Sequence, residues 1–216
     1  MNVRLTGYFL FALLLATIGR SDTTPTAVNK VESRTIVFFG DSLTAGLGLA
    51  EPAEEAFPGL IQKKLAAAHR AWRVVNAGLS GETTSGGLRR VEWILRQPVD
   101  VFVLELGGND GLRGIEPVVS RANLQGIIDR VRTKNPATKI LLTGMQMPPA
   151  LGADYIRDFA AIYAELAEKN HVAFVPFLLE GVGLRTDLNQ ADGIHPTAEG
   201  HAIVAENIWK YLEPLL

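Results

Sequence analysis

Three side chains in the sequence are of the types that nucleophilic catalysis needs: a serine, an aspartate and a histidine. Ser42 lies in the segment Gly-Asp-Ser-Leu-Thr, and Asp192 and His195 lie in Asp-Gly-Ile-His-Pro near the carboxyl terminus. A serine hydroxyl is a weak nucleophile until a base removes its proton. A carboxylate beside an imidazole fixes its tautomer and stabilises the imidazolium. We therefore predict that Ser42 attacks an acyl carbonyl, that His195 takes its proton and that Asp192 orients His195.

Attack on a carbonyl places negative charge on the carbonyl oxygen, which needs hydrogen-bond donors held ready for it. Two further polar, glycine-rich segments supply candidates, at residues 76–83 (NAGLSGET) and 107–111 (GGNDG). We expect the donors of this oxyanion hole to be the backbone amides of Ser42 and Gly78 and the side-chain amide of Asn109. Asp41, beside the nucleophile, is expected to tie down the turn by accepting backbone amides.

Short apolar runs alternate with longer amphipathic stretches from residue 34 onward. We expect strands at Thr35–Phe39, Arg73–Asn76, Val99–Leu106, Lys139–Thr143 and His171–Val175, and helices at Phe57–Ala68, Thr84–Arg96, Pro117–Lys134, Ala153–Lys169 and Thr197–Leu212. This alternation predicts an α/β fold, a three-layer α/β/α sandwich around a five-stranded parallel sheet. Ligands of such sheets bind beyond the carboxyl ends of the strands, which is where the segments carrying the candidate residues lie.

Four segments of the chain, taken together and in order, resemble the SGNH (GDSL) hydrolase family. They are GDSLTAGLGL, NAGLSGETTSGGL, ELGGNDGLRG and DGIHPTAEGH. Their sequences are most similar to those of the bacterial arylesterase and thioesterase–lysophospholipase branch of the family. The resemblance covers about Thr35 to Leu212. It implies a flavodoxin-like fold and hydrolysis of short- to medium-chain acyl esters without a cofactor, with thioesters and lysophospholipids as further substrates. It also implies the roles given above for Ser42, Gly78, Asn109, Asp192 and His195.

Two alternative functions stay open. The first is an O-deacetylase that acts on carbohydrates or cell-envelope polymers with the same residues. The second is a non-catalytic flavodoxin-like binding module, which would bind a nucleotide or flavin at the same sheet edge, although no phosphate-binding loop is present. The Gly-x-Ser-x-Gly elbow of a different hydrolase fold is also absent, because position 44 is threonine.

Composition narrows the function further. The chain has 216 residues, enough for one well-buried core, and it contains no cysteine. Its formal net charge of −2 argues against nucleic-acid binding. We expect no metal site, because His195 and His201 have no ligand partners at catalytic spacing. Arg89, Arg90 and Arg96 are expected to form one solvated face of a helix.

Substrate choice is expected to depend on two loops. The segment 144–152 (GMQMPPALG) carries Met145, Met147 and Leu151, which we expect to line an acyl-binding site because flexible thioethers adapt to varied apolar shapes. Core filling is an equally good interpretation of either methionine. Residues 177–184 (FLLEGVGL) are expected to form a second apolar wall.

The amino terminus is a separate region. Residues 1–20 contain an uncharged apolar run between Arg4 and Arg20 that favours a secretory signal peptide, with an uncleaved membrane anchor as the alternative. Residues 21–33 are expected to be a linker and residues 34–216 the hydrolase domain. The protein is therefore expected to be exported, as a periplasmic or secreted protein, or else to associate with a membrane through residues 1–20. A retained apolar segment would also allow a homo-oligomer, which the sequence leaves open.

Overall fold

Five parallel strands form a sheet in the order β2-β1-β3-β4-β5 within the computed structural model, which describes Met1 and residues 34–216. The strands are β1 (Arg34–Gly40), β2 (Trp72–Gly78), β3 (Val101–Leu104), β4 (Lys139–Thr143) and β5 (Ala173–Val175). This is the strand order of flavodoxin-like folds. The predicted fold class is confirmed. The expected signal or anchor (1–20) and linker (21–33) lie, apart from Met1, outside the described residues.

Burial explains why three of the strands read as continuous apolar runs. The central strands β1, β3 and β4 are buried along almost their whole length, because helices cover both faces of the sheet. The edge strands β2 and β5 are only partly buried. The core is therefore built mainly on the three central strands.

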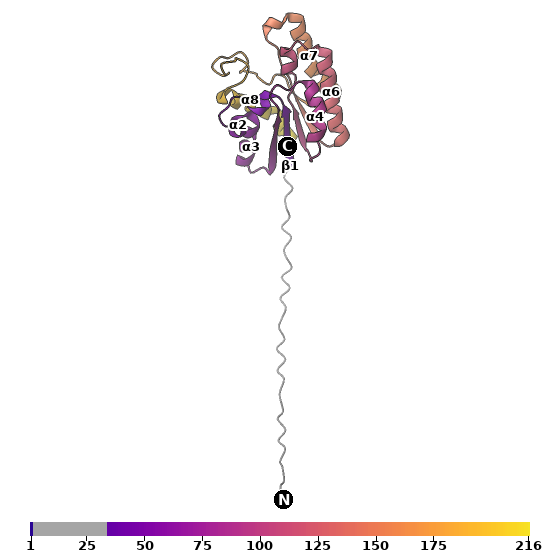
Figure 1. Cartoon of the computed structure of the whole chain (residues 1–216), viewed down its shortest axis with the longest axis vertical. Helices are drawn as coiled ribbons and strands as arrows, with labels where there is room; N and C mark the ends of the chain where they lie inside the picture. Colours follow the sequence, from indigo (N-terminus) through magenta and orange to yellow (C-terminus); the bar gives the residue numbers. More distant parts are fainter. Residues whose placement is uncertain (2–33) are drawn as a thin grey trace. The chain divides into compact units, whose positions relative to one another are not determined.

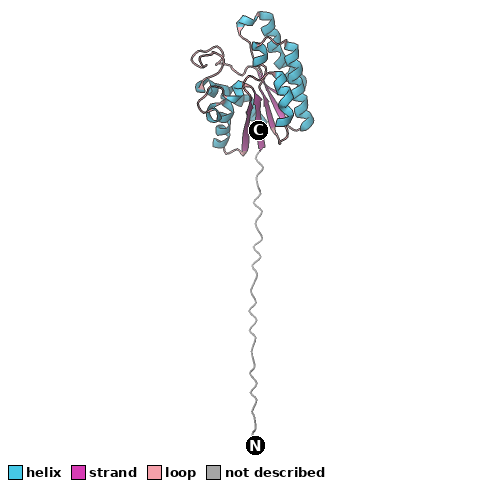
Figure 2. Ribbon diagram, viewed as in Figure 1, coloured by secondary structure: helices cyan, strands magenta, loops and turns pink. Residues whose placement is uncertain are grey.

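Helices form a layer on each side of the sheet (Figures 1 and 2). Helices α3 (Phe57–Ala67) and α8 (Ala198–Leu212) pack together on one face, and α4 (Thr84–Ile94), α6 (Pro117–Lys134) and α7 (Ala153–Asn170) cover the other. Thr83 and Thr197 cap α4 and α8, each accepting a hydrogen bond from a backbone amide of the first turn. No helix of the described part is long and apolar enough to cross a membrane.

Several short elements were not predicted, because a single turn of helix leaves no periodic apolar pattern. They are α1 (Ser42–Ala45), α2 (Pro52–Glu55), α5 (Gly108–Leu112) and the 3₁₀ turns Pro149–Leu151 and Glu213–Leu215. Some strand boundaries also differ: β3 is two residues shorter at each end than expected, and β5 begins two residues later. His171 does not open β5 but ends α7 with a left-handed backbone (φ 49°).

Candidate active site

The turn after β1 presents Ser42 at the carboxyl edge of the sheet. Asp41 caps α1, with its carboxylate accepting the Leu43 amide at 3.0 Å, and Ser42 is the first residue of that helix. Glu105, at the end of β3, lies behind the turn. Its Oε2 accepts the Asp41 amide at 3.1 Å and the Thr44 hydroxyl at 2.7 Å. The serine therefore stands on a turn that is held from two sides.

The structure brings Ser42, His195 and Asp192 into one chain of contacts. His195 Nε2 lies 2.8 Å from Ser42 Oγ, and His195 Nδ1 lies 2.6 Å from Asp192 Oδ2. The other oxygen of Asp192 accepts the backbone amides of Ile194 and His195, each at 3.0 Å. The hydrogen bond from the His195 side chain, with these amides, lowers the pKa of Asp192 to about 2. Asp192 is thus a carboxylate at neutral pH, placed to hold the ring.

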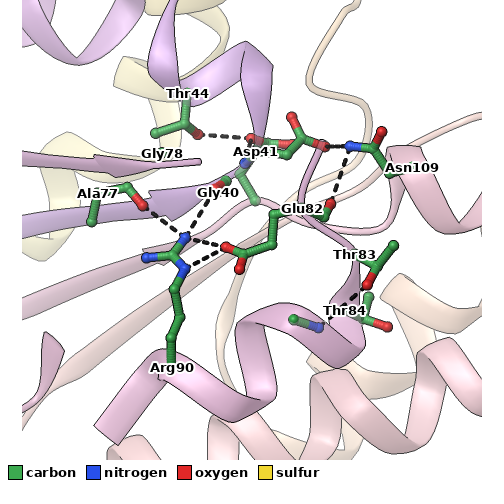
Figure 3. A network of polar contacts seen from close by, with 12 residues as sticks. Gly40, Asp41, Thr44, Ala77, Gly78, Glu82, Thr83, Thr84, Arg90 and Asn109 are labelled. Atoms are coloured by element: carbon green, nitrogen blue, oxygen red, sulfur yellow. Dashed lines mark hydrogen bonds and ion pairs between the residues drawn. The ribbon is translucent and has the colours of Figure 1, made fainter. Parts of the chain in front are cut away.

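Asn109, in α5 after β3, faces the nucleophile turn from the other side. Its side-chain nitrogen donates to Asp41 Oδ2 at 3.0 Å and to the Glu82 carbonyl at 3.1 Å (Figure 3). The amide group is therefore oriented by the loops after β1 and β2 together. Asn109 and Ser42 line the same cavity.

Gly78, by contrast, is not brought to the cavity. Its amide donates to Asn76 Oδ1 at 2.9 Å, and a Cβ added there would lie 2.3 Å from the Ala45 backbone nitrogen. Glycine at 78 therefore serves the close approach of α1 to β2. The amide of Gly78 is already used, which removes the basis for predicting it as an oxyanion donor.

Gly81, three residues later, lines the cavity instead. The Glu82 amide donates to the Leu79 carbonyl at 3.1 Å, closing a turn in which Gly81 has a φ of 78° that favours glycine. Within residues 34–216 the Gly81 amide has no hydrogen-bond partner. The sequence analysis named Gly78 in this segment and not Gly81, because the order of residues holds no signal that distinguishes the two glycines.

The cavity at this edge has a volume of about 340 Å³ and a mainly apolar lining. Met145 and Met147 line it and also belong to the buried core, so the two residues fill the core and face the cavity at once. Leu151 does not reach the cavity, because it lies in a 3₁₀ turn packed against the core. Residues of the expected second wall, 177–184, also line the cavity. The exposed apolar side chains at its opening are Leu47, Leu112, Leu184 and Ile194.

Two acids beneath the nucleophile were not singled out as functional from the sequence. Burial raises the pKa of Asp41 to about 6. Burial, followed by the charge of Asp41, raises the pKa of Glu105 well above its usual value. Glu105 Oε1 is buried and has no hydrogen-bond partner within the described residues. The available signal for Glu105 was an acid inside the apolar strand segment VDVFVLEL.

Arg90 corrects the prediction of a solvated arginine face on α4. Arg89 is exposed, but Arg90 turns inward and its guanidinium lies 4.0 Å from the centre of the Phe39 ring. Its Nη2 donates to the Gly40 and Ala77 carbonyls at 3.2 and 2.9 Å, and its Nε donates to Glu82 Oε2 at 2.5 Å (Figure 3).

His201, the other histidine considered as a metal ligand, lies outside the chain of contacts between Ser42, His195 and Asp192. His201 is buried in α8, where its Nδ1 accepts the Phe57 amide at 3.3 Å and its ring stacks on Phe57. Burial lowers the pKa of His201 to about 4, so it stays neutral as part of the core. In the part of the chain that the structure describes, no group of three or more histidine, aspartate or glutamate side chains is placed to hold a metal ion.

Comparison with known proteins places this site in a family. The model of the GDSL-like Lipase/Acylhydrolase family matches residues 38–203. Esterase TesA of Pseudomonas aeruginosa is 42% identical over 185 residues, which are 85% of this chain and 90% of that protein. Thioesterase 1/protease 1/lysophospholipase L1 of Escherichia coli is 38% identical over 187 residues, 84% of this chain and 85% of that protein.

The likeness extends to three dimensions. A crystal structure of TesA superposes with a TM-score of 0.80 at 42% identity, covering 85% of this chain and 100% of that one. The matched region contains all four segments that carry the candidate residues. The chain therefore belongs to the GDSL-like lipase/acylhydrolase family.

Proposed function

We propose that this protein is a serine esterase that hydrolyses acyl esters through a covalent acyl-enzyme. The observation that carries the proposal is the Ser42–His195–Asp192 chain of contacts, which opens into an apolar cavity. The names of the relatives, esterase TesA and thioesterase/lysophospholipase L1, support the same reaction class.

The first half of the proposed reaction forms the acyl-enzyme. His195 Nε2, at 2.8 Å, takes the proton of Ser42 Oγ as the oxygen attacks the acyl carbon. The Asp192 carboxylate stabilises the resulting imidazolium. His195 then gives the proton to the leaving alkoxide as the ester bond breaks. In the second half a water molecule attacks the acyl-enzyme by the same proton transfers, releasing the acid and restoring Ser42.

The charge on the carbonyl oxygen requires donors at the same edge of the cavity. We assign these to the Ser42 amide, the Gly81 amide and Asn109 Nδ2, with Gly81 in place of Gly78. The support for Gly81 is its position in the cavity lining and its unpartnered amide. In the free protein the two hydrogens of Asn109 Nδ2 are donated to Asp41 Oδ2 and to the Glu82 carbonyl, so an oxyanion would share or replace one of these two acceptors.

The cavity lining supports apolar acyl groups. Leu43, Met145, Met147, Phe177 and Leu179 surround the space next to Ser42. We therefore propose short- to medium-chain esters, aryl esters included, as substrates, with thioesters and lysophospholipids as further candidates. An acetylated sugar would find few polar partners in such a cavity, which disfavours the O-deacetylase alternative.

Substitution of the nucleophile tests the proposal. We expect Ser42→Ala to lose at least about three orders of magnitude in kcat on a chromogenic acyl ester, as removal of a triad residue does elsewhere. We also expect a fluorophosphonate probe to label the wild-type protein at Ser42. Near-wild-type turnover by Ser42→Ala would rule out Ser42 as the nucleophile. A folded wild-type protein that shows neither turnover nor labelling would rule out the esterase and favour the non-catalytic binding module.

We further propose that residues 1–20 direct export, so that the enzyme acts in the periplasm or outside the cell. The support is the sequence alone: an apolar run between Arg4 and Arg20 that is shorter than a typical membrane span. Retention of this segment would instead anchor the enzyme to a membrane surface.

A further inference from the structure

We propose that Arg90 is a positioning residue for the oxyanion donors. It acts through Glu82 on the loop after β2, which carries the Gly81 amide and the carbonyl that accepts a hydrogen bond from Asn109. The inference rests on the proposed esterase function and concerns a residue that touches no substrate. It goes beyond the triad and donors assigned above.

The guanidinium of Arg90 joins three segments that end at the active edge of the sheet. Through Nη2 it binds the last carbonyl of β1, at Gly40, and the carbonyl of Ala77 in β2. Through Nε and Nη2 it binds the Glu82 carboxylate in the loop after β2. Figure 3 shows these contacts converging on one side chain from α4.

The contacts continue from Glu82 to two of the assigned donors, Asn109 in α5 and Gly81 in the loop after β2. The carbonyl of Glu82 accepts Asn109 Nδ2 at 3.1 Å, and the amide of Glu82 closes the turn that presents the Gly81 amide. The turn is also held at its start, since the Leu79 amide donates to the Gly40 carbonyl at 3.0 Å. Gly40 thus accepts from Arg90 and from the turn, which links the donor loop to the strand that ends at the nucleophile.

Arginine suits this place for two reasons. Its planar fork donates along several fixed directions at once, which the point charge of a lysine does not. The side chain of Glu82 is only 4% exposed and that of Arg90 only 22%, so removing either charge would leave the other one buried without a partner. Donors in a buried site stabilise a transition state only when they are held where the charge develops.

The test compares Arg90→Lys with Arg89→Lys in the full chain. Arg89 lies one residue earlier on the same helix and is exposed, and among the described residues its guanidinium donates a hydrogen bond to the Ser85 hydroxyl alone. We measure kcat per fluorophosphonate-titrated serine, KM, inhibition by an alkyl boronic acid and the melting temperature. The boronic acid is a mimic of the tetrahedral intermediate, and it needs the donors as the transition state does.

We expect Arg90→Lys to lose about 10- to 100-fold in kcat per titrated serine, less than the complete loss of a donor can cost. Affinity for the boronic acid should fall by a similar factor, and KM should change little because the donors act on the transition state. Arg89→Lys should behave as the wild type in all four measurements.

A purely structural role would lower the melting temperature or the titratable fraction while kcat per titrated serine and boronic acid affinity stay at wild-type values. That result would overturn the inference. If Arg90→Lys does not fold, Glu82→Ala is used instead. This variant keeps Arg90 and its hydrogen bonds to the carbonyls of β1 and β2. We expect about a 10-fold loss in the same two quantities, and no loss would overturn the inference. A wild-type protein that neither hydrolyses esters nor reacts with the probe would instead refute the proposed function.

Discussion

Two aspartates within the same site show how environment decides what a residue does. Asp192 is about half exposed and accepts hydrogen bonds from His195, and its pKa falls to about 2. Asp41 is buried beneath the nucleophile, and burial raises its pKa to about 6. The residue type and the adjacent serine or histidine are visible in the sequence, but the burial that separates the two acids is a property of the fold. This is why Asp192 could be assigned from the sequence and the titration of Asp41 could not.

The raised pKa of Asp41 predicts a pH-dependent stability. Below about pH 4 the carboxyl is protonated in the folded and unfolded chains alike. As the pH rises from about 4 to 6, the unfolded chain releases its proton first, so the folded state loses stability over this window. Above about pH 6 the buried charge costs on the order of 3 kcal/mol.

Asp41→Asn removes the charge and leaves one side-chain oxygen, which can accept either the Leu43 amide or Asn109 Nδ2 but not both, as the two oxygens of Asp41 do. The loss of one hydrogen bond shifts stability by an amount that does not depend on pH. We expect the free energy of unfolding of Asp41→Asn, relative to wild type, to rise between about pH 4 and 6 and then level off. Urea unfolding at a series of pH values measures this difference. The exposed acid Asp158, replaced by asparagine, provides the comparison for a surface carboxylate. A difference for Asp41→Asn that is flat with pH would contradict the burial cause.

At the scale of elements, the sequence predicted the strands and the long helices well because apolar runs and amphipathic stretches are read directly from residue order. The ends of β1, β2 and β3 placed the candidate segments at one edge. Contacts between different elements could not be predicted from the order of residues. Gly78 and Gly81 share a segment, and only the approach of α1 to β2 shows that Gly78 is a packing residue. Leu151 was misjudged for a similar reason, since a short 3₁₀ turn directs it to the core.

The two glycines should respond differently to alanine. Gly81→Ala introduces a Cβ with space around it but a φ of 78° that costs about 1 kcal/mol, and relief of that strain would turn the amide away from the cavity. We expect kcat per titrated serine to fall by at least about 10-fold. Gly78→Ala places a Cβ against the Ala45 backbone and should cost about 1–3 kcal/mol of stability, as overpacking does.

Thermal unfolding and active-site titration of both variants separate these effects. The fall in kcat per titrated serine of Gly81→Ala should be larger than its loss of stability explains. Gly78→Ala should have the lower melting temperature of the two variants. Wild-type kcat per titrated serine in Gly81→Ala would argue against the Gly81 amide as a donor and reopen the choice of the third group.

At the scale of the whole molecule, the site and the start of the described domain lie at opposite edges of the sheet. Arg34 begins β1 at the amino edge, and the same strand ends at Gly40 beside the nucleophile turn. The residues that line the cavity all belong to 34–216. The described residues from β1 onward thus carry all the candidate catalytic groups, and the role that we propose for residues 1–20 is export.

This separation predicts that the amino-terminal segment can be removed without loss of catalysis. A chain starting at Glu32 should hydrolyse a soluble chromogenic ester with the kcat/KM of the wild type, because β1 and the catalytic residues are intact. Expressed with its own amino terminus in a bacterium, the full chain should yield active protein outside the cytoplasm, and mass analysis should show loss of the apolar segment before residue 34. Active protein of full mass in the membrane fraction would instead identify residues 1–20 as an anchor. Full-mass protein confined to the cytoplasm would refute export, and a shortened chain that folds but has lost activity would show that the domain needs the region before β1 after all.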